Sequence, residues 1–185
     1  MDKVRYISID IETTGLIPRN HQILEFAAVA WADDGPIMEQ PYFHRVIKPH
    51  GDIIGDPFAL AMNMELIKKI AEGEGTPVGV AMQEFRGWLY DLGVRTDDPV
   101  NVIGQNFGKF DLQFLNKVSW PSCYFSHRIF DLSSITATRN SMPSGSTLGD
   151  IPELKGNPHE ALFDARRALS HAQDFINWNT FNEIT

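Results

Sequence analysis

The feature that most constrains the fold is a run of ten almost uninterrupted apolar residues from Ile23 to Ala32. A strand that is covered on both faces of a sheet shows such a run, whereas a strand with one wet face alternates. The segments on either side, Val4–Glu12 and Tyr42–Lys48, alternate in this way. The first 48 residues therefore predict a three-stranded antiparallel meander with the apolar run at its centre.

Helical and strand patterns alternate after the meander. Apolar residues at three- and four-residue spacing predict helices, and short apolar runs between them predict further strands. The expected helices cover Phe58–Ala71, Val80–Leu92, Phe107–Val118, a short segment after the last strand, and His159 to about Trp178, and the expected strands cover Pro99–Ile103 and Arg128–Phe130. A mixed α/β sheet with helices on its faces follows. The loop from Asn140 to Gly149, rich in small polar residues, is expected to be the most mobile.

Length and composition predict one globular domain over residues 1–185. Hydrophobic residues make up 43% of the chain and charged residues 22%, which excludes global disorder. No apolar run approaches the roughly 18–20 residues of a membrane-spanning helix, and the start lacks a signal peptide. The lone Cys123 excludes an internal disulfide and a multi-cysteine zinc site. We expect a cytoplasmic protein without a membrane partner.

The charge balance narrows the kind of partner. Sixteen Lys and Arg against 24 Asp and Glu give a net charge of −8, whereas a protein that grips long duplex DNA gains affinity from positive surface and counterion release. An acidic chain can still act on nucleic acid if its carboxylates hold divalent metals and the substrate is short or single-stranded. Charge alone leaves a small-molecule enzyme and a protein-binding module open.

Asp10 and Glu12 form the first candidate site. The period of two in a strand puts both carboxylates on one face, with Cα atoms roughly 6.6–7 Å apart. Two such side chains can reach one hard cation, which prefers oxygen ligands. The alternative is that the acids only end the strand in solvent, although acids are poor strand formers.

Asp111 is the second candidate, because it stands inside the apolar stripe of its expected helix. A carboxylate that faces a core is costly unless it is paired, hydrogen-bonded or bound to metal. A hydrogen bond to a backbone N–H is the simpler explanation.

The segment HEALFDARRAL supplies the third candidate site. From Ala161 to Ala172, alanines recur at four, three and four residues, which predicts close packing of the last helix on a sheet, and Asp164 borders that stripe. His159 is five residues earlier, or about 140° around a helix, so it is expected at the helix entrance or in the preceding loop. A histidine there is usually structural, but it is also the side chain best suited to accept a proton near pH 7.

Two other segments are set aside. The stretch Gly104–Lys109 looks like a phosphate-binding loop but lacks the Walker spacing and the following Ser or Thr. Glu25, within the apolar run, is expected to make a buried structural hydrogen bond and not to bind metal.

Together these segments resemble the DEDD superfamily of 3′→5′ exonucleases, specifically its histidine branch, the DnaQ-like (DEDDh) family. The motif D-x-E-T-T-G-L is complete at Asp10–Leu16, and H-x-A-x-x-D-A is complete from His159 to Ala165. The middle motif is represented by Asn106, Phe110 and Asp111, with Phe and Leu following. The resemblance implies a ribonuclease H-like fold, which is a five-stranded mixed sheet flanked by helices.

The resemblance also implies roles for these residues. Asp10, Glu12 and Asp164 would ligate one of two divalent cations, Mg²⁺ or Mn²⁺. Asp10 would also touch the second cation, with Asp111 supporting it through water, and His159 would deprotonate the attacking water. The substrate-binding set would be Thr13, Thr14, Leu16, Asn106 and Phe110. Leu16 and Phe110 would wedge and stack against terminal bases, and backbone amides near Thr13 would hold the 3′ end. The product would be a 5′ mononucleotide.

The resemblance leaves several alternatives open. The stretch Tyr124–Ile135 is similar to oligoribonuclease, whereas Thr13 and Thr14 favour the proofreading group, so single-stranded DNA and RNA 3′ ends are both candidates, and a ribonuclease T-like enzyme is a third. Because the chain ends soon after the third motif, a free-standing exonuclease domain is expected, with a homodimer or a polymerase partner open. An inactive nucleic-acid-binding or scaffold domain and a small-molecule phosphohydrolase are the alternatives of other classes.

Overall fold

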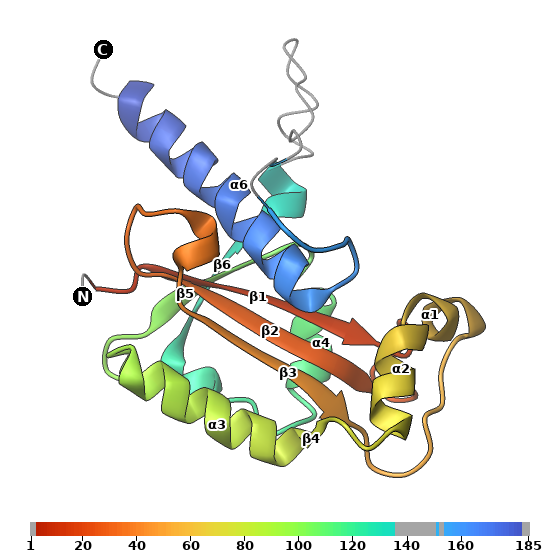
Figure 1. The fold of residues 1–185 in the computed structure, drawn as a ribbon. Helices are drawn as coiled ribbons and strands as arrows, with labels where there is room; N and C mark the ends of the chain where they lie inside the picture. Colours follow the sequence, from red (N-terminus) through yellow and green to blue (C-terminus); the bar gives the residue numbers. More distant parts are fainter. Residues whose placement is uncertain (1–2, 136–150, 152–153, 183–185) are drawn as a thin grey trace.

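The computed structural model describes residues 3–135, 151 and 154–182, so the loop expected from Asn140 to Gly149 lies outside the described residues. Its sheet has the strand order β4-β3-β2-β1-β5-β6 (Figure 1). The strands are β1 (Tyr6–Thr13), β2 (Ile23–Trp31), β3 (Tyr42–Lys48), β4 (Thr76–Pro77), β5 (Val100–Gly104) and β6 (Phe125–Asp131). The mixed α/β architecture of a ribonuclease H-like fold is confirmed.

The sheet is mixed in direction, as expected. β1 pairs antiparallel with β2, and β2 with β3, which confirms the meander. β5 runs parallel to β1, and β6 parallel to β5. The sheet has six strands where five were expected, because the two residues of β4 pair with the end of β3. A segment this short has no periodicity from which a strand can be predicted.

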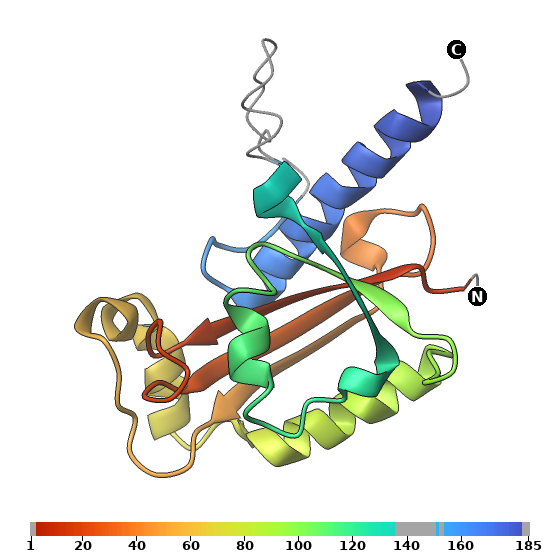
Figure 2. The same ribbon diagram turned by 180° about the vertical axis from the view of Figure 1, so that it is seen from behind.

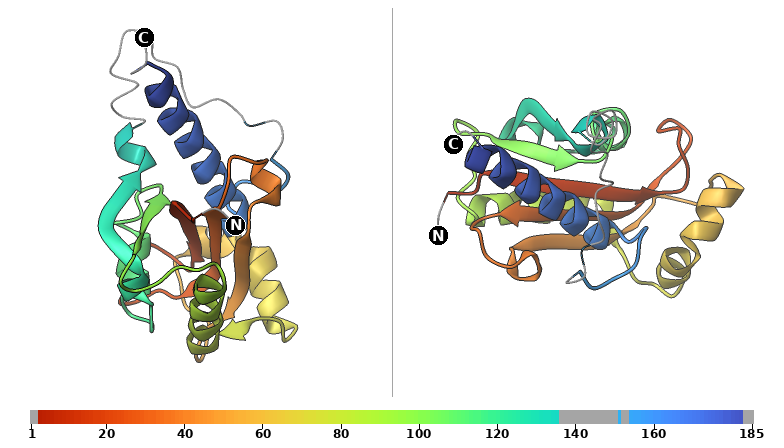
Figure 3. Two further views of the ribbon diagram at one scale, coloured as in Figure 1. Left: turned by 90° about the vertical axis from the view of Figure 1, so that its left-hand side faces the viewer. Right: turned by 90° about the horizontal axis from the view of Figure 1, so that it is seen from above.

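Helices cover both faces of the sheet (Figures 1 and 2). All nine residues of β2 are buried, as its apolar composition predicts. On one face, Phe85 of α3 (Val78–Asp91) packs against Phe26 of β2 and Phe43 of β3, in the same core cluster as Ile7, Ile9 and Ile11 of β1. On the other face lies α6 (Ala161–Asn182), whose alanine stripe is buried against β2 and β5. Figure 3 shows α6 and α3 on opposite sides of the sheet.

The helix expected over Phe58–Ala71 is divided in two. The structure has α1 (Pro57–Met62) and α2 (Met64–Ala71), separated by Asn63 at φ −95° and ψ 21°. Asn63 is buried, and its Nδ2 donates to the carbonyl of Thr13 at 3.2 Å. This tertiary bond accompanies the break in a segment whose apolar spacing alone predicts continuity.

Two other helices begin later than expected. In place of Phe107–Val118, the structure has α4 (Asp111–Leu115), which follows a turn begun by Asn106 at φ 60°. The last helix begins at Ala161 and not at His159, whose φ of 69° is left-handed and cannot continue a right-handed helix. The short helix after β6 is present at residues 132–135. A short 3-10 turn, η1 (Ile37–Glu39), joins β2 to β3, and another, η2 (Ser122–Tyr124), precedes β6.

Candidate active site

Asp10 and Glu12 lie on the face of β1 that is covered by α6. Their neighbours Ile9 and Ile11 belong to the core on the opposite face, beneath α3. In the ladder with β2, Asp10 is opposite Ala27 and Glu12 is opposite Glu25. The alternation predicted from the sequence therefore places both carboxylates on one face at the end of the strand.

Asp111 is the first residue of α4 and is only 3% exposed. Its carboxylate interacts with two backbone N–H groups, its own and that of Ile11 in β1. Its charge also acts on Asp10 more strongly than that of any other carboxylate. The explanation by a backbone hydrogen bond is therefore correct, and the same carboxylate also stands beside the acids of β1.

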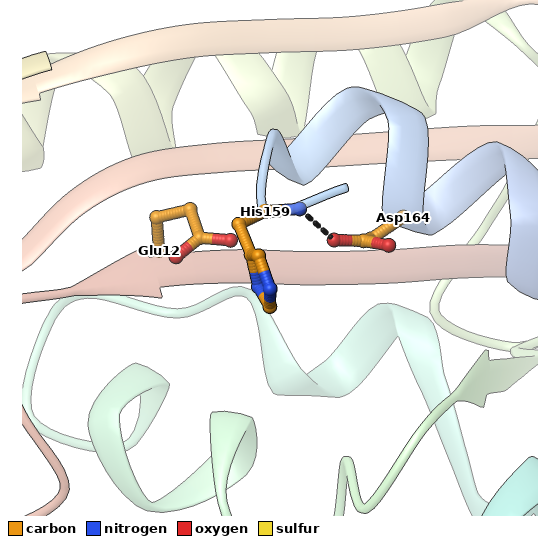
Figure 4. A group of neighbouring side chains, drawn as sticks. All are labelled: Glu12, His159 and Asp164. Carbon is orange, nitrogen blue, oxygen red and sulfur yellow. Dashed lines mark hydrogen bonds between the residues drawn. The ribbon is translucent and has the colours of Figure 1, made fainter. Parts of the chain in front are cut away.

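The entrance to α6 brings the third motif to the end of β1. Single ligand atoms of Glu12, His159 and Asp164 all lie within 4.8 Å of one another. The backbone N–H of His159 donates to Oδ2 of Asp164 at 2.8 Å, as Figure 4 shows. The other oxygen of Asp164 is 2.8 Å from Nη2 of Arg167. His159 is exposed and precedes the helix, as the sequence predicts.

Burial and crowding perturb the acids strongly. Burial raises the pKa of Asp10 well above its usual range, and the charges of Asp111, Asp164 and Glu12 raise it further. Burial raises the pKa of Glu12 to about 8, although a hydrogen bond from Asn63 lowers it. Burial likewise raises the pKa of Asp111 to about 7, with a smaller contribution from Asp131. Such perturbed carboxylates in one cluster are typical of functional sites.

The residues suit a divalent cation. Carboxylate oxygens are the ligands that Mg²⁺ and Mn²⁺ prefer, and the ligand atoms of Glu12, His159 and Asp164 converge within reach of one ion. A bound cation would also offset the repulsion that raises the pKa of Asp10.

The two threonines of the first motif are buried, and their hydroxyls are used inside the protein. The hydroxyl of Thr13 donates to the carbonyl of Gly15 at 2.9 Å, and that of Thr14 donates to the carbonyl of Ile54 at 2.8 Å. The Thr14 hydroxyl also accepts from the N–H of Gln22 at 2.9 Å. These bonds tie the turn after β1 to two other loops.

The same turn presents Leu16, which is 77% exposed. A Cβ on Gly15, at φ +154°, would lie 2.5 Å from the ring of His21, so this close packing needs glycine. His21 in turn accepts the N–H of Ile17 through Nδ1 at 2.9 Å. The turn thus holds an apolar side chain outward at the end of β1.

Asn106 and Phe110 lie before α4. Asn106 is exposed, and its N–H donates to Oδ1 of Asp131 at 3.1 Å. Phe110 is half-buried, with its ring centroid 5.2 Å from that of Phe114. Asp131 also accepts the N–H of Ser133 at 2.9 Å, so one carboxylate at the end of β6 fixes the turn that carries the second motif.

The sequence interpretation missed three residues that shape the site. Asn63 contacts Glu12 and Thr13, Asp131 holds Asn106, and His44 pairs with Glu25. A polar residue within an apolar helical pattern was the available signal for Asn63. The buried structural hydrogen bond expected of Glu25 is confirmed, since its two oxygens contact His44 and the N–H of Ala161.

Comparison with solved structures supports the fold. The cell-death related nuclease 4 (CRN-4) superposes with a TM-score of 0.63 at 15% identity, over 94% of this chain and 64% of that one. Escherichia coli exonuclease I, in a zinc-bound complex with single-stranded DNA, superposes with a TM-score of 0.64 at 18% identity. That match covers 94% of this chain and 40% of exonuclease I. The chain thus spans less than two thirds of either relative.

The fold is that of ribonuclease H-like proteins, and its candidate metal-binding group of Glu12, His159 and Asp164 lies at the end of β1. Residues 7–171 match the family model RNase_T, described as exonuclease, so the chain belongs to this exonuclease family, within the DEDD superfamily. The sequence has no significant match among curated proteins. In the described part of the chain, no helix is both long and apolar enough to cross a membrane.

Proposed function

We propose that this protein is a 3′→5′ exonuclease of the histidine branch that converts single-stranded or frayed nucleic-acid ends to 5′ mononucleotides. The observation that carries the proposal is the convergence of Glu12, His159 and Asp164 within 4.8 Å, beside the half-buried Asp10 and the buried Asp111. Asp10, Glu12 and Asp164 would hold two divalent cations, with Asp111 assisting through water. The cations, when bound, would activate water and stabilise the leaving 3′ oxygen.

His159 would act as the general base. Its exposed imidazole lies next to Glu12 and Asp164, where a ring nitrogen can accept the proton of the attacking water. The water oxygen attacks the phosphorus that joins the last two nucleotides. The bond from this phosphorus to the 3′ oxygen of the penultimate nucleotide breaks, and the terminal nucleotide leaves with its 5′ phosphate. The hydrogen bond from the His159 N–H to Asp164 holds this residue beside the acids.

A single-stranded end is the substrate that this surface suits best. Base stacking tolerates any sequence. Two side chains offer apolar surface here: the exposed Leu16, just after β1, and the half-buried Phe110, just before α4. The net charge of −8 disfavours long duplex contacts. The single-stranded DNA in the exonuclease I complex supports a DNA substrate, and RNA is the alternative that the assay must compare.

The test is digestion of 5′-labelled DNA and RNA oligomers of several lengths with Mg²⁺, Mn²⁺ or EDTA. We expect a ladder of shortening products that requires metal and is blocked by a modified 3′ end. Asp10→Ala should abolish the activity without loss of folding, because removal of one charge relieves repulsion in the cluster. Asp91→Ala, at the exposed end of α3, is the control. Full activity of Asp10→Ala, or release of the 5′ label as a mononucleotide at once, would refute the proposal.

A further inference from the structure

The beginning of α6 is attached to the sheet by a buried carboxylate. The first N–H groups of a helix have no partner within it. In α6 the N–H of Ala161 donates to Oε2 of Glu25 in β2 at 2.8 Å, across 136 positions of sequence. The other oxygen, Oε1, is 2.6 Å from Nε2 of His44 in β3. Glu25 is 4% exposed, so two adjacent strands and the helix are joined inside the protein.

This attachment lies next to the proposed catalytic residues. Ala161 is two residues after His159 and three before Asp164. A displacement of the backbone at Ala161 would therefore displace His159 and Asp164 as well. Glu25 is also the cross-strand neighbour of Glu12. The paired strands β1 and β2 therefore carry the proposed metal ligand Glu12 and, beside it, Glu25. Glu25 holds the start of α6, near which His159 and Asp164 lie.

We propose that Glu25, oriented by His44, is a positioning residue that sets the entrance of α6, and with it His159 and Asp164, at the distance from Glu12 that hydrolysis requires. The inference rests on the proposed function for its catalytic consequence. Glu25 acts through the helix and not as a ligand, because both of its oxygens already have partners inside the protein. Among the described residues, the group that could hold an ion contains Glu12, His159 and Asp164 and does not contain Glu25.

A carboxylate at this buried position is energetically unfavourable. Burial of a charged group is unfavourable without partners, and Glu25 adds negative charge that raises the pKa of Asp10 and of Glu12. An apolar residue would continue the run of β2 without this cost, but it could not hold the N–H of Ala161. Residues that orient metal ligands typically change metal affinity or activity by about 10–100-fold when they are replaced.

The experiment compares Glu25→Ala, Glu25→Gln and His44→Ala with the wild type, all assayed well below their melting temperatures. Glu84→Ala is the matched control, because Glu84 pairs with Arg45 of the same β3 strand but on the exposed surface, at 2.7 Å. The measurements are kcat and KM on a labelled oligonucleotide, Mn²⁺ affinity by calorimetry, and hydrogen exchange of the peptide that contains Ala161.

We expect Glu25→Ala to lower kcat by about 10–100-fold with little change in KM, to weaken Mn²⁺ binding, and to speed exchange at the start of α6. Glu25→Gln should retain most of the activity, since its amide oxygen can still accept the N–H of Ala161. His44→Ala should cause a smaller loss of the same kind, and it tests the inference if Glu25→Ala does not fold. The control should match the wild type.

Three results would overturn the inference. One is a lower melting temperature with unchanged kcat and exchange in Glu25→Ala, since that is a purely structural role. Another is an equal loss in Glu25→Gln and Glu25→Ala, since charge would then matter and not the hydrogen bond. The third is unchanged Mn²⁺ affinity and exchange in both Glu25→Ala and His44→Ala. If the wild type digests no oligonucleotide, the proposed function fails, while Mn²⁺ affinity and exchange still decide whether Glu25 positions the helix.

Discussion

The backbone N–H of His159 donates a 2.8 Å hydrogen bond to the side chain of Asp164, five residues later. Two residues at this spacing within one helix would be about 140° apart and could not meet. They meet because His159 lies outside the helix at φ 69°, so the chain turns back over the first turn of α6. The proposed general base is thus held by a proposed metal ligand through its backbone, and its imidazole is left free to reach the site.

This geometry predicts how substitutions at His159 separate stability from activity. A non-glycine residue in the left-handed region costs roughly 1–2 kcal/mol, so His159→Gly should be at least as stable as His159→Ala. Both should lose on the order of 10²–10⁴ in kcat if the imidazole is the base. Melting temperature and initial rate, measured on the same preparations, check this. If His159→Ala keeps its kcat and has only a lower melting temperature, His159 stabilises the start of the helix and takes no part in the reaction.

The raised pKa of Glu12 predicts a pH-dependent cost in the metal-free protein. Its folded pKa of about 8 lies above the ordinary value of 4.5, so the folded chain holds this proton more tightly than the unfolded chain. Without metal, the contribution of Glu12 to the unfolding free energy therefore decreases as pH rises from about 4.5 to about 8. Glu12→Gln lacks this decrease, so its stability relative to wild type should increase through the same window in EDTA.

Denaturant titrations at several pH values measure this difference. Glu65→Gln, at an exposed position in α2, is the control. Its stability relative to wild type should not change with pH over this range. Saturating Mn²⁺ should stabilise the wild type most at high pH, where the carboxylates are ionised, and should do less for Glu12→Gln. A difference between Glu12→Gln and wild type that does not vary with pH would contradict the prediction.

Asn63, between α1 and α2, is expected to hold the carboxylate of Glu12 in place. Its side chain hydrogen-bonds Glu12 and donates to the carbonyl of Thr13. Asn63→Ala should lower the unfolding free energy by about 1–3 kcal/mol, because buried partners lose their bonds. It should also weaken Mn²⁺ binding, which calorimetry measures. Asn116→Ala, exposed after α4, should change neither, and an effect on stability alone would show that Asn63 only joins α1 to α2.

Leu16 should affect substrate binding and not folding. Its side chain is 77% exposed, so Leu16→Ala removes little buried surface, and the melting temperature should stay near that of the wild type. Loss of an apolar contact to a terminal base should raise KM for the oligonucleotide, since burial of apolar surface contributes about 25 cal/mol per Å². Tyr90→Ala, which removes another exposed apolar side chain on α3, is the control. An unchanged KM for Leu16→Ala would show that Leu16 does not contact the substrate.

Much of the site can be predicted from the sequence, because its signals are local. The period of two in β1 places Asp10 and Glu12 on one face, and the stripe around Asp111 predicts its burial, which the structure has at 3% exposure. The alanine spacing of α6 predicts a helix packed closely on the sheet. The substrate-binding roles of Thr13, Thr14, Leu16, Asn106 and Phe110 stay predictions.

The sequence by itself determined every strand except β4, the main helices and the residue types of the site, since periodicity and motif spacing depend on neighbours along the chain. Only the tertiary structure decided the break at Asn63, the left-handed turn at His159 and the partners of Glu25. The bond from Ala161 to Glu25 joins residues 136 positions apart, and no local pattern records such a pairing. Buried polar groups must find partners wherever folding brings donors and acceptors together, so these contacts exist only once the sheet and α6 have packed.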